Sequence, residues 1–177
     1  FDAWLGQNAP FISDALTVSP YLGFGSLKDT LSGAVERGKG VFVLAATSNP
    51  EGASVQRATI GESTLAKSMW DSLSEVNRVT ADGNARFGNF GAVLGATLNL
   101  QSFGLAEVLD GQPSAATPIL APGFGAQGAE LSASKQLFGA ARSQVIHSVS
   151  RSVLQAGAAG LAKSIEVAKS ELALGLG

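Results

Sequence analysis

Five apolar segments of four to six residues alternate with helical patterns along this chain of 177 residues. Each segment ends in residues that are polar or are glycine or proline, as strands do where they leave a buried sheet. A regular alternation of strand and helix is typical of βαβ units, in which the strands are parallel and the crossovers right-handed. The predicted strands cover residues 14–18, 41–46, 90–94, 118–121 and 144–149.

The segments between the predicted strands carry apolar residues at helical spacing. In the first, Leu27, Leu31 and Val35 recur every four residues, and Ser26 with Asp29 fits the S-x-x-D pattern of a helix start. Further helices are predicted at residues 63–78, 100–109, 131–138 and 151–155, and loops at 47–52 and 80–89. Gly157 and Gly160 are expected to interrupt the chain before a final amphipathic helix with Leu161, Ile165, Ala168 and Leu172 on one face.

Two architectures fit five parallel βα units: an open doubly wound sheet and five-eighths of a (β/α)8 TIM barrel. A complete barrel usually needs about 250 residues. The chain begins Phe1-Asp-Ala-Trp-Leu5, like the end of a helix, and its one methionine is Met69. We therefore expect residues 1–177 to form a single domain that supplies about the last five βα units of a barrel, with the N-terminal units upstream of Phe1.

Composition argues against several classes of partner. The formal net charge is −2 and no block of lysine and arginine occurs, so nucleic acid is not an expected partner. The chain has no cysteine and one histidine, which argues against a thiolate metal site and a zinc centre. No apolar run approaches the ~20 residues that span a bilayer. We expect a cytoplasmic protein without membrane contact.

The segment after the fourth predicted strand is the strongest candidate for a ligand site. Pro122 ends the strand, because proline has no N–H to donate, and Gly123, Gly125 and Gly128 follow within six residues. Glycine accepts positive φ and has no Cβ to hold a ligand away, so such a loop suits backbone amides that approach an oxyanion. Gln127 adds a neutral hydrogen-bond donor.

An arginine follows the fifth predicted strand. Arg151 begins a predicted helix, so its guanidinium and the helix N-terminus suit a phosphate group. TIM barrels often hold phosphate in the loops after strands seven and eight, which would be the fourth and fifth strands of this chain. Two other interpretations stay open: a structural glycine turn, and a dinucleotide-binding G-x-G-x-x-G turn, which here lacks its acidic residue about 20 positions later.

Other polar residues near strand ends are weaker candidates. Ser48 offers a hydroxyl and an amide to the polar edge of a ring or, alternatively, caps a turn, and Thr97 is expected to be a turn residue. His147 lies within the fifth strand and is expected to be structural. None of the six lysines ends a predicted strand, and no nucleophile–base pair or carboxylate pair can be built. The segment is therefore expected to hold a phosphorylated ligand without transforming it.

Five stretches carry a family resemblance: Asp14–Leu27, Thr47–Gly52, Gly95–Thr97, Ala121–Gly128 and Ser150–Ser152, in this order. Together they resemble the orotidine 5'-phosphate decarboxylases, and in detail the bacterial subgroup with a T-S-N-P loop. The resemblance implies a (β/α)8 barrel that forms a homodimer. It also implies conversion of orotidine 5'-monophosphate (OMP) to uridine 5'-monophosphate (UMP) and CO2, a step of pyrimidine synthesis that needs neither cofactor nor metal.

The resemblance implies roles for individual residues as well. Ser48 would contact the pyrimidine edge, and Gln127 would reach toward the phosphate and the base. Arg151 and the backbone amide of Ser150 would hold the phosphate. The loop that would close over the ligand comprises Pro122, Gly123, Gly125, Gln127 and Gly128.

The chain departs from the family in one respect. The family's catalytic Lys/Asp cluster, a D-x-K-x-x-D motif with a preceding lysine, has no counterpart here and is expected upstream of Phe1. We therefore expect no catalytic residue in this chain, and residues 1–177 alone to be inactive. The alternatives are a non-catalytic module that binds a phosphorylated ligand, and another phosphate-binding barrel enzyme.

Overall fold

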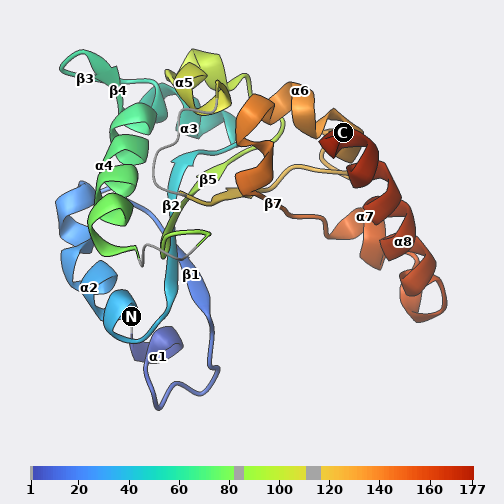
Figure 1. The fold of residues 1–177 in the computed structure, drawn as a ribbon, viewed down its shortest axis with the longest axis horizontal. Coiled ribbons are helices and arrows are strands. Elements are labelled where there is room, and N and C mark those ends of the chain that lie inside the picture. Colours follow the sequence, from blue (N-terminus) through green and yellow to red (C-terminus); the bar gives the residue numbers. More distant parts are fainter. Residues whose placement is uncertain (1, 82–85, 111–116) are drawn as a thin grey trace.

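The computed structural model describes residues 2–81, 86–110 and 117–177 (Figure 1). Its centre is a five-stranded sheet in the order β1-β2-β5-β6-β7. A two-stranded antiparallel ribbon is formed by β3 (Thr59–Ile60) and β4 (Ser63–Thr64). The sheet strands are β1 (Ala15–Val18), β2 (Gly40–Ala46), β5 (Phe90–Leu94), β6 (Ile119–Ala121) and β7 (Val145–His147).

The order of the strands distinguishes the two candidate architectures. Each new strand of the sheet pairs in parallel with the preceding one and extends the sheet in the same direction. A doubly wound sheet reverses this direction at a switch point, and no reversal occurs among the described strands. The order is that of consecutive units in a (β/α)8 barrel. The predicted fold is confirmed.

Helices connect the parallel strands. α2 and α4 both pack against β2, and α8 lies at the β7 end of the sheet, where it contacts α6 and α7 (Figure 1). The α-helices are α1 (Asp2–Leu5), α2 (Lys28–Glu36), α3 (Pro50–Gln56), α4 (Leu65–Thr80), α5 (Ala106–Leu109), α6 (Ser134–Phe138), α7 (Arg151–Leu154) and α8 (Gly157–Leu176). The 3-10 helices are η1 (Phe24–Leu27), η2 (Leu100–Phe103), η3 (Leu131–Ala133) and η4 (Gly139–Gln144).

Neighbouring strands place their side chains in rows on the two faces of the sheet. The row that faces the helices consists of Val43, Ala92, Ile119 and Val145. The row on the opposite face consists of Leu44, Val93, Leu120 and Ile146. Ile119 is fully buried in the first row, whereas Ile146 in the second is 47% exposed. The core of the described chain therefore lies between the sheet and the helices.

A buried asparagine fastens α4 to β5. The side chain of Asn77 is fully buried, and its Nδ2 donates to the Phe90 carbonyl oxygen (2.6 Å) and to Thr117 Oγ1 (3.1 Å). Its Oδ1 accepts from the Phe90 backbone N–H (3.1 Å). One amide side chain thus pairs both backbone groups of the first residue of β5.

Two predictions about helix starts are wrong. Ser26 does not cap α2, because it lies within η1 and its Oγ donates to the Gly23 carbonyl oxygen (2.7 Å). The predicted loop at 47–52 becomes helical at Pro50, where α3 begins after Asn49. Proline suits the first turn of a helix, because the N–H that it lacks would have no helical partner there.

Two predicted helices have other bounds. α4 begins at Leu65, two residues later than predicted, because Thr64 Oγ1 accepts from the Lys67 N–H (3.0 Å) and caps the helix. The predicted helix at 100–109 is divided into η2 and α5, and Gly104 between them has φ of 74°.

The predicted interruption of the C-terminal helix is also wrong in part. Gly157 has φ of 64° and starts α8, but Gly160 lies inside this helix. The predicted loop at 80–89 begins with Thr80, which is the last residue of α4, and its residues 82–85 lie outside the described part of the chain.

Candidate functional site

The glycine loop, residues 122–129, follows β6 and closes on itself through hydrogen bonds. The Gly125 N–H donates to the Ala129 carbonyl oxygen (2.8 Å), and the Ala129 N–H donates to the Gly123 carbonyl oxygen (3.2 Å). Gly123, Gly125 and Gly128 have φ of 118°, 70° and 108°. Residues with a side chain rarely adopt these values, so the loop requires glycine at all three positions.

The tip of the glycine loop carries the amides that are open to a ligand. The Gly128 N–H donates to the Gly125 carbonyl oxygen (2.9 Å), which places Ala126 and Gln127 at the centre of a tight turn. Within the described part of the chain, the amides of these two residues donate no hydrogen bond. The glycine amides at 125 and 128 are thus occupied inside the loop, and the two tip amides are available to an anion.

The glycine loop contacts the start of α7. A Cβ placed on Gly125 would lie 2.2 Å from Ser152 Oγ, so the loop backbone touches the residue next to Arg151. Ser150 and Arg151 are both exposed, and the Arg151 guanidinium makes no hydrogen bond or ion pair with the described residues. The loops after β6 and β7 therefore lie side by side. Ser152 belongs to the stretch Ser150–Ser152 that carries the family resemblance, but the sequence predicted no role for it.

The loops after β2, β5 and β6 meet at the same end of the sheet. A Cβ on Gly95 would lie 3.4 Å from the Ser48 backbone nitrogen, and one on Gly123 would lie 3.3 Å from Thr97 Cγ2. These contacts connect the exposed Ser48 to the glycine loop through the residues that follow β5. The predicted site residues thus occupy consecutive loops at the carboxyl ends of the strands, where barrel enzymes hold their ligands.

A polar network shapes the loop that carries Ser48. The Thr47 backbone N–H donates to Gln56 Oε1 (2.9 Å), and Gln56 Nε2 donates to Thr47 Oγ1 (2.8 Å). Thr47 Oγ1 in turn donates to Asn49 Oδ1. Gln56 at the end of α3 therefore holds Thr47, and Thr47 in turn holds the side chain of Asn49 on the other side of Ser48.

Gln127 and Arg151 do not line one described cavity. Gln127 faces an open cavity of about 600 Å³ together with Thr97 and Asn99. Gly125 and Ser152 instead line a cavity of about 240 Å³ with Lys163 of α8. The loops that carry Gln127 and Arg151 are in contact, but the two side chains do not line the same cavity.

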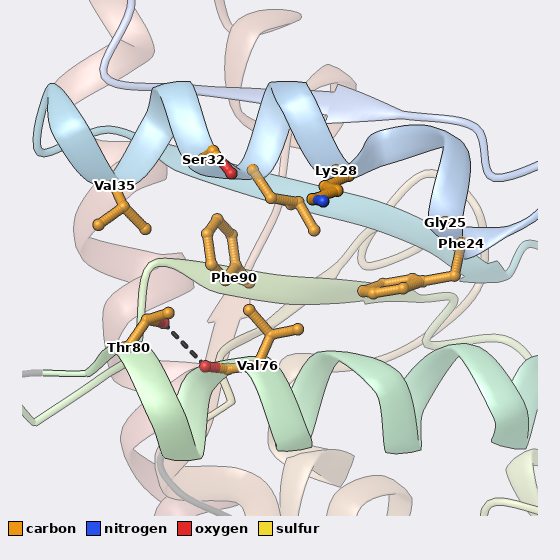
Figure 2. Close-up of a pocket in the computed structure, with 9 residues that line it drawn as sticks. Phe24, Gly25, Lys28, Ser32, Val35, Val76, Thr80 and Phe90 are labelled. Atoms are coloured by element: carbon orange, nitrogen blue, oxygen red, sulfur yellow. Dashed lines mark hydrogen bonds between the residues drawn. The ribbon is translucent and has the colours of Figure 1, made fainter.

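A third cavity lies between α2 and α4. It has a volume of about 310 Å³ and is lined mainly by apolar side chains of α2 and α4, with Phe90 between the helices (Figure 2). Lys28 and Ser32 of α2 also line this cavity (Figure 2). None of the predicted site residues lines this cavity.

His147 has a structural environment, as expected. Its Nε2 lies 2.7 Å from Ser134 Oγ, and its ring lies 5.1 Å from the Phe124 ring, centre to centre. Burial lowers the pKa of His147 below its ordinary value. The lowered pKa favours the neutral imidazole, whose hydrogen bond with Ser134 connects β7 to α6.

The described residues contain no group of three or more His, Cys, Asp or Glu side chains placed to hold a metal ion. In the same residues, no helix is long and apolar enough to cross a membrane. All six lysines belong to the described part of the chain, and none stands at the carboxyl end of a sheet strand.

Residues 7–163 match the Orotidine 5'-phosphate decarboxylase / HUMPS family. The chain belongs to this family. An orotidine 5'-phosphate decarboxylase from Streptomyces coelicolor is 47% identical over 158 residues, which are 88% of this chain and 52% of that protein. One from Salinispora arenicola is 46% identical over 156 residues, again 88% of this chain and 52% of the relative. The chain thus spans about half the length of the curated relatives it matches.

Solved structures of the family share the fold. A structure from Streptomyces avermitilis assigned to orotidine 5'-phosphate decarboxylase superposes with a TM-score of 0.85 and 41% identity, over 99% of this chain and 59% of that one. The OMP decarboxylase of Leishmania donovani gives a TM-score of 0.66 and 27% identity, over 92% of this chain and 57% of its own. The five βα units therefore match a continuous architecture in larger members of the family.

Proposed function

We propose that the protein to which this chain belongs converts OMP to UMP and CO2, and that this chain supplies the phosphate- and base-binding half of the site. The observation that carries the proposal is the contact between Gly125 and Ser152. It sets the tip amides of the glycine loop beside the helix that begins with Arg151, at the carboxyl ends of two paired parallel strands. The relatives from Streptomyces coelicolor and Salinispora arenicola are orotidine 5'-phosphate decarboxylases, which supports OMP as the ligand.

Each predicted residue takes a role that its chemistry allows. Arg151 and the Ser150 amide grip the phosphate, because a guanidinium binds phosphate oxygens in pairs. The amides at the tip of the loop that runs from Pro122 to Gly128 donate to the same group. Gln127 reaches between phosphate and base, and Ser48 meets the polar edge of the pyrimidine.

The decarboxylation breaks the bond between the ring carbon and its carboxylate. CO2 leaves, the electron pair stays on the ring carbon, and a proton takes the vacated position. The binding energy of the distant phosphate lowers the barrier if it drives closure of the loop and expels water. The acid and the charged groups at the reacting carbon come from residues outside this chain, because no lysine here stands at a strand end.

The proposal includes the assembly as well. Residues 1–177 form one domain within a complete barrel, the protein is a cytoplasmic homodimer, and the reaction uses neither cofactor nor metal. A second candidate is a module that binds a phosphorylated ligand without turnover. Because no lysine stands at the carboxyl end of a sheet strand, this second candidate is favoured for the chain in isolation. An assay of OMP consumption by the complete protein distinguishes the non-catalytic module from the decarboxylase.

Substitution of Arg151 tests the proposal. In the complete protein, Arg151→Ala is expected to raise the Kd for UMP about 10- to 150-fold, since a hydrogen bond to a charged group contributes about 1.5–3 kcal/mol. The Kd for uridine, which lacks the phosphate, is expected to stay the same. Arg78→Ala is the matched control, because Arg78 is exposed and pairs with Glu75 (2.6 Å) on α4. Unchanged UMP affinity in Arg151→Ala would remove Arg151 from the site.

A further inference from the structure

The long helix α8 contacts the segment after the glycine loop through a carboxylate. Glu171 Oε1 accepts hydrogen bonds from the backbone N–H groups of Leu131 (2.7 Å) and Ser132 (3.4 Å). These groups begin η3, and the first N–H groups of a helix have no helical partner. The residue before η3, Glu130, makes no side-chain cap. Glu171 therefore caps this helix from a position 40 residues later in the chain.

A glycine one turn further along α8 lets the two backbones approach. A Cβ on Gly175 would lie 2.3 Å from the Leu131 carbonyl oxygen and 2.8 Å from the Ser132 carbonyl oxygen. No side chain tolerates such distances to backbone oxygens, so the approach depends on glycine at this position. The contacts of Gly175 and Glu171 are separate, and both reach the same two residues.

The C-terminal end of α8 is held by cations from the neighbouring helices. Lys135 Nζ donates to the Gly177 carbonyl oxygen (3.0 Å), and Arg142 Nε donates to the Leu176 carbonyl oxygen (3.2 Å). Positive charge stabilises the C-terminus of a helix, where carbonyl groups lack partners. α8 and the segment from η3 to η4 therefore cap each other's ends, and Figure 1 shows them side by side.

A short covalent path joins this contact to the glycine loop. Leu131 follows Ala129 by two residues, and Ala129 closes the loop by its hydrogen bonds to Gly123 and Gly125. A shift of Leu131 would move Ala129 and with it the turn that presents the tip amides. We propose that Glu171 is a positioning residue for the anion-binding loop. The inference rests on the proposed function, because the phosphate of UMP is the anion assigned to that loop.

Hydrogen exchange tests the positioning without a ligand. In the complete protein, Glu171→Ala is expected to speed amide exchange of Gly125, Gly128 and Ala129, whose N–H groups hold the loop closed, about tenfold, because a charge-assisted hydrogen bond is strong enough to change an opening equilibrium by that factor. Amides of α2 and α4 should exchange at the wild-type rate. Glu166→Ala is the matched control, since Glu166 lies on the same helix and pairs with Lys169 (2.9 Å) at the surface.

Ligand affinity gives the second readout. Glu171→Ala should raise the Kd for UMP about tenfold and leave the Kd for uridine unchanged, because the loop contacts the phosphate. Glu171→Gln keeps an acceptor oxygen at the same place and is expected to stay within about threefold of wild type. If Glu171→Ala lowers the Tm but leaves loop exchange and UMP affinity at wild-type values, the inference is overturned.

A failure of the proposed function would be visible separately. Wild-type protein that binds no UMP would refute the proposed ligand. In that case the exchange data alone decide the inference: faster exchange of Gly125, Gly128 and Ala129 in Glu171→Ala supports it, and unchanged exchange of these three amides overturns it.

Discussion

Removal of the Asn77 side chain should cost more stability than any other polar truncation on α4. Asn77→Ala deletes the partner of both backbone groups of Phe90, at the start of β5. The site is fully buried, and a Cβ on the adjacent Gly88 would lie 2.2 Å from Asn77 Oδ1, so the surroundings are closely packed. Water therefore cannot readily replace the lost amide.

The expected magnitude follows from two unpaired groups. A buried donor or acceptor without a partner costs about 1–3 kcal/mol, so the N–H and C=O of Phe90 together predict a loss of about 2–6 kcal/mol. The free energy of unfolding of a whole domain is about 5–15 kcal/mol. In a domain near the lower value, a loss of about 6 kcal/mol would unfold the protein.

Urea denaturation of the complete protein measures this loss. Ser74→Ala is the control, because Ser74 lies on the same helix and makes one long contact of 3.3 Å to Thr117, the residue that Asn77 also contacts. We expect the control to stay within about 1 kcal/mol of wild type. If Asn77→Ala unfolds at the same urea concentration as Ser74→Ala, the assigned role of Asn77 is refuted.

Two further predictions concern a glycine and the histidine. Gly91→Ala should destabilise by about 1–3 kcal/mol, because its Cβ would lie 2.4 Å from the Phe42 ring and 2.6 Å from the Pro118 carbonyl oxygen; Gly25→Ala, with no atom within 4 Å of its Cβ, should be neutral in the same melt. The folded-state pKa of His147 lies below the ordinary value of 6.5, so its contribution is present above pH 6.5 and is lost as the pH falls through the folded-state pKa. His147→Gln should therefore flatten the decline of stability on acidification, and an unchanged slope in denaturation between pH 7 and pH 5 would contradict this.

The strands were predictable because each is short, apolar and bounded by residues that break strands. Val41 to Ala46 and Phe90 to Leu94 appear in the structure almost as predicted, with β2 starting one residue earlier. Helix starts were less accessible, because they depend on single hydrogen bonds. Ser26 and Thr64 both carry a hydroxyl suited to capping a helix. The Thr64 hydroxyl accepts from a free N–H of α4, whereas the Ser26 hydroxyl donates to the Gly23 carbonyl oxygen and caps no helix.

The candidate site was predictable at the level of loops. Parallel pairing of β6 with β7 brings Ala121 opposite His147, and the residues that follow them must then lie close together. The direction of side chains within those loops was not predictable from spacing. Three hydrogen bonds inside the glycine loop turn the amides of Gly125, Gly128 and Ala129 inward. Distant contacts such as that of Glu171 leave no local signal at all.

The two faces of the sheet are covered to different degrees by the described residues. On the helix side, side chains such as Ile119 are fully buried among described residues, so these five units contain a core of their own. On the opposite face, Leu120 is half-buried and Ile146 is 47% exposed. Of the two strands that precede the proposed phosphate loops, β6 is buried on the helix side, whereas Val145 of β7 is half-buried there. The geometry of the glycine loop is fixed by hydrogen bonds within this chain, between Gly123, Gly125, Gly128 and Ala129.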